Sequence, residues 1–193
     1  MDSNSPNENH GWGEFIDQFF QWEIDKTKTI LDYFDAQVRK NSEATALIFK
    51  RQSLTFRELD TRSNQLAHYL SSFISDTKRP IGIAIPRSAD MVIGLLGIMK
   101  TGTAYVPLDP THPKNRLQLM IEDANVEVLL GSEEIFETLS HLSLKTVSLD
   151  KFQYENFSEE PLNINVKGDD TFLVSFTSGS TGRPKGVKGH HTA

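Results

Sequence analysis

The most informative segment of this sequence is Thr171-Phe172-Leu173-Val174-Ser175-Phe176-Thr177-Ser178-Gly179-Ser180-Thr181-Gly182-Arg183-Pro184-Lys185-Gly186. Its first six residues are rich in β-branched and aromatic side chains, which predicts a strand over 171–176. The next ten contain three glycines, four hydroxyl side chains and a lysine. A strand that runs directly into such a loop is typical of α/β proteins, whose ligands bind beyond the carboxyl ends of strands.

The composition of this loop favours phosphate binding. Glycines let the backbone approach a ligand closely and adopt positive φ, so that successive N–H groups form a concave anion site. Hydroxyl groups add donors, and a lysine adds a mobile cation suited to phosphate. A serine- and glycine-rich surface turn is the alternative, but the lysine and the preceding strand favour a ligand site. The candidate phosphate-binding residues are Thr177, Ser178, Gly179, Ser180, Thr181, Gly182, Lys185 and Gly186.

The loop does not have the pattern of a Walker A motif. That motif requires a lysine directly after its last loop glycine, with a helix following. Here Arg183 and Pro184 separate Gly182 from Lys185, and Gly186 follows the lysine. Proline and glycine both disfavour a helix that begins at the lysine. We therefore expect a different and flexible phosphate loop, with no further strand of the sheet behind it.

Upstream of the loop, strand-like and helix-like segments alternate. Thr55 can accept a hydrogen bond from the N–H of Glu58 while the Glu58 side chain reaches back, a capping box that begins a helix. Ser88 and Gly102 mark the two ends of another helix, Ser88 as its N-cap and Gly102 as its left-handed stop. We predict strands over 44–49, 81–85, 104–108, 126–130, 144–149 and 171–176, helices over 30–41, 55–74, 88–100, 113–124 and 132–141, and a polar connection over 151–169. This alternation predicts an α/β fold with a mainly parallel sheet and flanking helices.

Length, charge and hydropathy indicate one soluble cytoplasmic domain over 26–193, preceded by a mobile tail and an aromatic docking helix over 1–25. The net charge of -6 argues against nucleic acid as the main partner. There is no cysteine, which excludes disulfides, thiolate metal sites and a catalytic thiol. The longest apolar run, 91–99, is far shorter than the ~20 residues that span a bilayer. We therefore expect neither a nucleic-acid nor a membrane partner.

The loop and two further segments occur in an order typical of one enzyme superfamily. Residues 172–187 resemble the AMP-binding signature of the adenylate-forming superfamily. Leu54-Thr55-Phe56-Arg57-Glu58-Leu59 resembles the first core motif of nonribosomal peptide synthetase adenylation domains. Their second motif is similar to Met99-Lys100-Thr101-Gly102-Thr103-Ala104-Tyr105-Val106-Pro107-Leu108-Asp109. The resemblance extends from about Lys26 to the last residue.

This resemblance implies ATP-dependent activation of an amino acid or related carboxylic acid. The acid's carboxylate attacks the α-phosphate of ATP, and the acyl adenylate then passes to the phosphopantetheine thiol of a carrier protein. The implied cofactors are ATP and magnesium, with the loop residues holding the β- and γ-phosphates. The acid pocket, the magnesium ligand and the catalytic lysine of the family lie in later segments, so we assign no catalytic or metal-binding residue here. The resemblance thus implies the incomplete N-terminal part of a large domain, inactive alone.

Two alternatives remain open from the sequence. The start of a fatty-acyl-AMP ligase or acyl-CoA synthetase would share the loop, although the segment 105–109 favours a peptide synthetase. A non-catalytic protein that binds a partner through its aromatic N-terminal helix is the other alternative.

Several residues in or near the motifs are expected to be structural. Lys100 is interpreted as a partner of the helix dipole, and Glu58 as a cap rather than an acid or base. We expect Asp109 to shape a turn and Arg183 to face solvent. His190 and His191 are adjacent and are expected to lie at a solvated terminus.

Overall fold

The computed structural model describes residues 25, 27–74, 76–177 and 183–192. The tail and aromatic helix predicted over 1–25 lie, apart from Asp25, outside these residues, and so does part of the glycine loop. No helix among the described residues is long and apolar enough to cross a bilayer.

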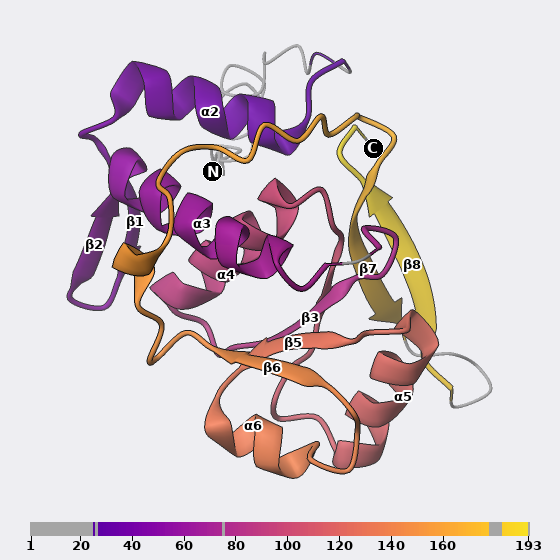
Figure 1. Ribbon diagram of the computed structural model, residues 1–193. Coiled ribbons are helices and arrows are strands. Elements are labelled where there is room, and N and C mark those ends of the chain that lie inside the picture. The colour runs from indigo at the N-terminus through magenta and orange to yellow at the C-terminus, as the bar shows by residue number, and fades with distance from the viewer. Residues whose placement is uncertain (1–24, 26, 75, 178–182, 193) are drawn as a thin grey trace, which may run out of the picture.

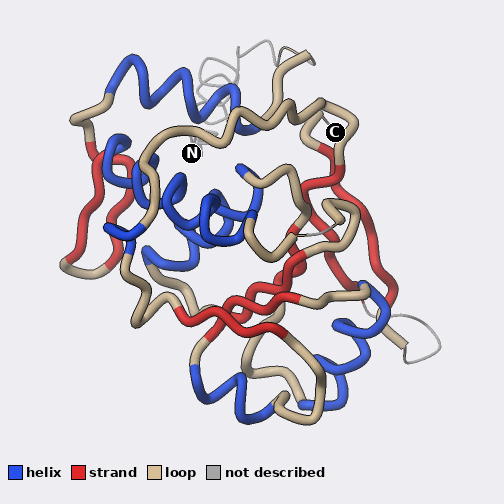
Figure 2. The backbone as a smooth tube through the Cα atoms, in the orientation of Figure 1, coloured by secondary structure: helices blue, strands red, loops and turns tan. Residues whose placement is uncertain are grey.

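A six-stranded sheet in the order β6-β5-β3-β4-β7-β8 forms the centre of the molecule (Figures 1 and 2). All neighbouring strands pair in parallel except β7 and β8, which are antiparallel. The strands are β3 (Ile81–Ala84), β4 (Tyr105–Pro107), β5 (Val128–Gly131), β6 (Lys145–Ser148), β7 (Thr171–Thr177) and β8 (Lys185–His190). The predicted α/β class and the mainly parallel sheet are therefore confirmed.

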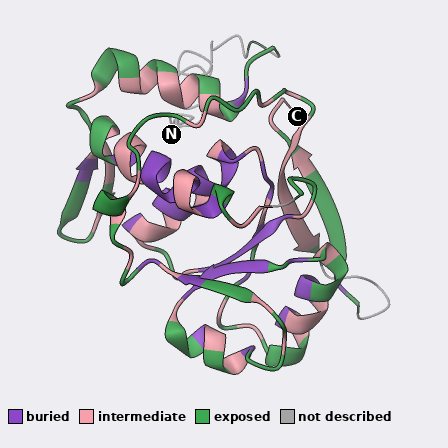
Figure 3. Ribbon diagram, in the orientation of Figure 1, coloured by how far each residue is buried: buried purple, intermediate pink, exposed green. Residues whose placement is uncertain are grey.

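Helices cover both faces of the sheet, with α3 and α4 on one side and α5 and α6 on the other (Figure 1). The helix α2 packs on the outside of α3. The helices are α2 (Ile30–Asn41), α3 (Phe56–Ser71), α4 (Ala89–Lys100), α5 (Lys114–Ala124) and α6 (Glu133–Thr138). The central strands β3 and β5 are fully buried, whereas β8 is largely exposed (Figure 3). The core thus consists of two apolar clusters, one on each face of the sheet.

Local capping signals define the start of α3 and both ends of α4 as predicted. The Thr55 hydroxyl accepts from the N–H of Glu58 at 3.1 Å, and the Glu58 carboxylate accepts from the N–H of Thr55 at 2.8 Å. Ser88 caps α4 by accepting from the N–H of Met91 at 3.1 Å. Gly102 has φ 72°, the left-handed stop expected behind α4. Each of these signals depends on residues only a few positions apart, which explains why the sequence predicts them.

The segment around residues 50–55 differs from the prediction. A short strand β2 (Gln52–Thr55) pairs antiparallel with β1 (Thr45–Phe49) in a separate two-stranded sheet. The helix α3 therefore begins at Phe56, directly after this strand. It also ends earlier than predicted, at Ser71 rather than at residue 74. The hairpin turn contains Lys50 at φ 54° in place of the glycine that would have marked it in the sequence.

The connection over 151–169 is more ordered than predicted, because it contains a 3-10 helix (Tyr154–Asn156) and lies against α3. The Asn64 side chain donates to the carbonyl of Glu159 at 2.7 Å. The rings of Phe152 and Phe157 stack with their centroids 5.3 Å apart, and both contact Tyr69 of α3. Aromatic burial, which spacing alone did not indicate, thus fixes this segment between β6 and β7.

Candidate phosphate-binding site

The two ends of the glycine loop lie side by side at the end of β7. The register of β7 and β8 pairs Thr177 with Lys185 and Phe176 with Gly186. Thr177 and Lys185 are both exposed, so their hydroxyl and ammonium groups are accessible to a ligand. Of the predicted phosphate-binding set, the structure therefore places Thr177, Lys185 and Gly186. The remaining predicted residues lie outside the described part of the chain: Ser178, Gly179, Ser180, Thr181 and Gly182.

The strand β8 corrects two expectations about the residues after the loop. We expected no strand there, yet Lys185–His190 pairs along β7, because the edge of β7 offers unpaired backbone groups. Gly186 is part of this extended strand and does not have the positive φ that we expected, Gly102 being the only glycine with positive φ in the described ranges. Lys185 thus stands on a paired backbone rather than on a flexible loop.

Arg183 is exposed, as predicted, but it is not isolated. Its Nε donates to Asp123 Oδ2 at 3.1 Å, and its Nη2 donates to Asp123 Oδ1. Asp123 lies in the last turn of α5, sixty residues away along the chain. Sequence reasoning missed this partner because no local pattern links two residues so far apart.

A pocket of about 430 Å³ opens where β3, β4 and β7 end. Its walls are mostly apolar, from residues such as Ile85, Leu95 and Tyr105, and Ser175 of β7 contributes a hydroxyl. Because β7 continues from Ser175 to Thr177, the pocket and the loop share the same strand. This is the carboxyl edge of the parallel strands, where α/β proteins bind their ligands.

The turn behind β4 has the structural role expected for Asp109. Its Oδ1 accepts from the N–H of Thr111 at 2.9 Å and from the Thr111 hydroxyl at 2.8 Å. The backbone hydrogen bond from Thr111, followed by the hydroxyl bond, lowers the pKa of the Asp109 carboxyl below its usual range. This carboxylate closes a turn.

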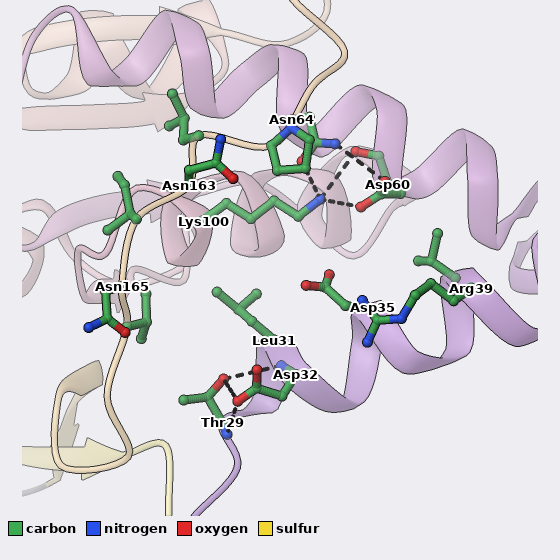
Figure 4. Close-up of a pocket in the computed structure, with 15 residues that line it drawn as sticks. Thr29, Leu31, Asp32, Asp35, Arg39, Asp60, Asn64, Lys100, Asn163 and Asn165 are labelled. Carbon is green, nitrogen blue, oxygen red and sulfur yellow. Dashed lines mark hydrogen bonds and ion pairs between the residues drawn. The ribbon is translucent and has the colours of Figure 1, made fainter.

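A second pocket, of about 410 Å³, lies between α2, α3 and residues 161–166 (Figure 4). On its wall, Lys100 Nζ donates to Asp60 Oδ1 and to Asn64 Oδ1, both at 2.6 Å, and to the carbonyl of Asp60 at 3.2 Å. These three acceptors satisfy the three donors of the ammonium group. Lys100 is therefore structural, as expected, but its partners are Asp60 and Asn64 of α3 rather than the dipole of its own helix.

The charges around this second pocket are partly buried. Burial lowers the pKa of Lys100, while the hydrogen bond with Asp60 opposes that shift. The nearby carboxyl of Asp35 points toward the pocket (Figure 4), and burial raises its pKa. Across the described residues, no group of three or more histidine, aspartate and glutamate side chains is placed to hold a metal ion.

The two histidines near the end of the described chain occupy different surroundings. His190 lies in β8, is exposed, and its Nδ1 is 2.7 Å from the carbonyl oxygen of Asp169. His191 is half-buried, and its ring centroid lies 5.2 Å from that of Phe172. Burial lowers the pKa of His191. The expectation of a solvated terminus is therefore wrong for His191.

Together, the parallel sheet, the paired ends of the loop at β7 and the pocket at the same edge define an α/β protein with its candidate ligand site at the carboxyl edge of the parallel strands. The profile of the family described as AMP-binding enzyme matches residues 34–193. The chain therefore belongs to the AMP-binding enzyme family.

Relatives in this family include peptide synthetases. The chain is 41% identical over 161 residues to zwittermicin A synthase ZmaJ of Bacillus cereus, covering 83% of this chain and 30% of ZmaJ. It is 35% identical over 180 residues to gramicidin S synthase 2 of Brevibacillus brevis, covering 92% of this chain and 4% of that protein. The chain thus spans less than a third of either relative, and the predicted resemblance to peptide-synthetase adenylation domains is confirmed.

Solved structures show the same fold. The N-terminal subdomain of Klebsiella oxytoca NpsA in complex with 3-hydroxybenzoyl-AMSN superposes with a TM-score of 0.74 and 28% identity, covering 85% of this chain and 41% of that one. The nonribosomal peptide synthetase FmoA3, in its α-methyl-L-serine-AMP bound form, has a TM-score of 0.76 at 23% identity, covering 86% of this chain and 18% of that one. These matches identify the fold as that of the N-terminal subdomain of adenylate-forming enzymes.

Proposed function

We propose that this chain carries the phosphate-binding part of an enzyme that activates an amino acid or related carboxylic acid with ATP. The product is an acyl adenylate, which passes to the phosphopantetheine thiol of a carrier protein in nonribosomal peptide synthesis. The observation that carries the proposal is the position of the family's loop. Its two ends, Thr177 and Lys185, are paired at the carboxyl end of β7, beside the pocket at the strand ends.

In the proposed reaction, a carboxylate oxygen of the acid bonds to the α-phosphorus of ATP, and the bond from that phosphorus to the bridging oxygen breaks. Pyrophosphate leaves with the negative charge that develops on the bridging oxygen. Lys185 and the Thr177 hydroxyl hold the β- and γ-phosphates and stabilise this charge. Such a reaction depends on positioning and charge stabilisation, so it requires no nucleophile from the protein.

The remaining predicted residues of the loop complete this phosphate site in the proposal, through their hydroxyl groups and glycine N–H groups: Ser178, Gly179, Ser180, Thr181, Gly182 and Gly186. Magnesium would accompany the triphosphate, but the described residues hold no carboxylate cluster suited to it, and we assign it no ligand in this chain. The names of the relatives, as peptide synthetases, support an amino acid and a carrier protein as partners. The requirement for ATP is met in the cytoplasm, which we propose as the location.

The phosphate site can be tested by titrating the 193-residue chain with magnesium-ATP while following its backbone amide resonances. The amides of Thr177 and Gly186 should shift, because they lie at the two ends of the loop. Lys185→Ala should weaken binding about tenfold or more, since a hydrogen bond from a charged group contributes roughly 1.5–3 kcal/mol. Lys188→Ala is the matched control, because it removes an exposed lysine from the same strand, and it should change the affinity less than about twofold.

Two results would contradict the phosphate site. One is the absence of any shift of the Thr177 and Gly186 amide resonances at ~10 mM magnesium-ATP, a concentration far above the Kd of ordinary nucleotide sites. The other is an equal loss of affinity in Lys185→Ala and Lys188→Ala, which would indicate attraction by the general charge of β8 rather than a site.

We propose that the reaction itself also requires the parts of the relatives' adenylation domain that lie outside the segment aligned with this chain. We propose that the chain alone binds triphosphate and forms no acyl adenylate. A hybrid in which residues 34–193 replace the aligned segment of ZmaJ should catalyse acid-dependent exchange of pyrophosphate into ATP, and Lys185→Ala should slow it. Exchange that is unaffected by Lys185→Ala in an active hybrid would remove the assigned role from this lysine.

A further inference from the structure

The described chain resumes after the glycine loop at Arg183, and this residue is bound to the end of α5. Two N–H groups of its guanidinium donate to the two oxygens of the Asp123 carboxylate, Nε to Oδ2 at 3.1 Å and Nη2 to Oδ1. Such a fork fixes direction as well as distance. The segment Arg183-Pro184-Lys185, called the Lys185 arm below, is thereby fixed to a helix that precedes it by sixty residues.

The position of Asp123 is not explained by the stability of its own helix. The last turn of α5 contains Glu122 and Asp123 and no basic residue. Acidic side chains in this position are repelled by the negative end of the helix dipole. Arg183 supplies the missing positive charge, and its hydrogen bond lowers the pKa of the Asp123 carboxyl.

The pair lies directly beside the lysine of the phosphate site. Only Pro184 separates Arg183 from Lys185; this proline is buried, and its ring fixes its own φ. On its other side, Lys185 is held by pairing with Thr177 in β7. The backbone of Lys185 is therefore fixed from both directions, by α5 through Arg183 and by the sheet through Thr177.

The exposure of the pair indicates a geometric role. The Arg183 side chain is 64% exposed. Ion pairs this accessible to water contribute little to folding stability. Their loss nonetheless frees the residues that they orient, here the arm that carries Lys185.

We infer that Asp123 is a positioning residue for the phosphate site, acting through Arg183 to hold the Lys185 arm against α5. This inference rests on the proposed function, in which Lys185 holds the phosphates of ATP. Asp123 itself makes no contact with the nucleotide, because its negative charge would repel a phosphate. Breaking the pair should therefore weaken triphosphate binding while leaving the fold intact.

Asp123→Asn tests this inference, with Glu122→Gln as the matched control. Both variants remove one negative charge from the same turn of α5, but Glu122 accepts from Gln118 Nε2 at 2.8 Å and has no hydrogen bond with Arg183. In titrations with magnesium-ATP, Asp123→Asn should weaken binding about fivefold and Glu122→Gln less than about twofold. Without nucleotide, trypsin should cleave the Lys185–Gly186 bond several times faster in Asp123→Asn only, because the arm is no longer fixed.

Restoring the pair in reverse separates positioning from charge. The double variant Asp123→Arg with Arg183→Asp should recover the resistance of the Lys185–Gly186 bond to trypsin. If Asp123→Asn lowers the midpoint of urea unfolding, its lower affinity could come from a less stable fold. Arg183→Gln then replaces it as the test, because it breaks the same ion pair at the exposed partner. The inference is overturned if wild type binds magnesium-ATP and Asp123→Asn and Arg183→Gln bind as wild type does. If wild type shows no shift at Thr177 and Gly186, the proposed function fails instead, and the role of the pair fails with it.

Discussion

Lys100→Met should lower the free energy of unfolding by about 3 kcal/mol. The Lys100 side chain is 9% exposed, and its ammonium lies 2.6 Å from acceptors on Asp60 and Asn64. Methionine would leave the Asp60 carboxylate and the Asn64 carbonyl without this donor. Removing one partner of a buried pair costs roughly 3–5 kcal/mol. The lower end applies because Asp60 is still 24% exposed and because methionine does not have the desolvation cost that lowers the pKa of Lys100.

Urea unfolding followed by circular dichroism measures this loss. With a slope of about 2 kcal/mol/M, the midpoint should fall by about 1.5 M. Lys78→Met removes an exposed lysine and is the control, for which we expect almost no change. Adding Asp60→Leu to Lys100→Met should recover much of the loss, because the carboxylate that had lost its hydrogen-bonded partner is then removed as well. A midpoint for Lys100→Met as high as that of Lys78→Met would refute the reasoning.

Two further predictions concern His191 and the contact between α3 and α4. Because burial lowers the pKa of His191, the unfolded state binds its proton more readily, so stability is lost as the pH falls through the ordinary value of 6.5. As the pH is lowered from 8 to 5, the urea midpoint should therefore fall less in His191→Leu than in wild type. An equal fall in the two proteins would contradict this. Gly97→Ala should cost about 2 kcal/mol despite the better helix propensity of alanine, since its Cβ would lie 2.8 Å from Leu66 Cδ2 and 3.2 Å from Leu66 Cβ. Gly94→Ala should cost less in the same melts, because its Cβ would be too close only to Ile83 Cδ1, the flexible tip of that side chain, at 2.8 Å. The reverse order of the two losses would count against this account.

The parts of the fold that the sequence predicted are those marked by local signals. Thr55 with Glu58, Ser88 and Gly102 each act within one helical turn, so the start of α3 and both ends of α4 were predictable. The apolar run of β3 is buried on both faces, and its pattern was equally plain. The alternation of such segments was sufficient for the α/β class and for the position of the loop at a strand end.

The features that the sequence did not predict depend on residues far apart in the chain. Lys185–His190 contains two glycines and few apolar residues, and it becomes a strand because the edge of β7 is available to it. Gln52–Thr55 similarly becomes a strand by pairing with β1. The partners of Lys100 and Arg183 are 36 to 60 residues away, and no periodic pattern links such distant positions. For the candidate site, the sequence therefore indicated which residue types bind the ligand, but not which distant residues fix their positions.

The pairing of Thr177 with Lys185 has a consequence for how this region tolerates insertions. Side chains along a strand alternate between the two faces of the sheet, so a slip of one residue between β7 and β8 would turn the lysine to the opposite face. An extra residue between 178 and 182 lies outside both strands and leaves this alternation intact. An extra residue within 185–190 reverses it for every position that follows. Variation in loop length is thus compatible with the register of β8, whereas an insertion in the strand changes the face on which every later side chain lies.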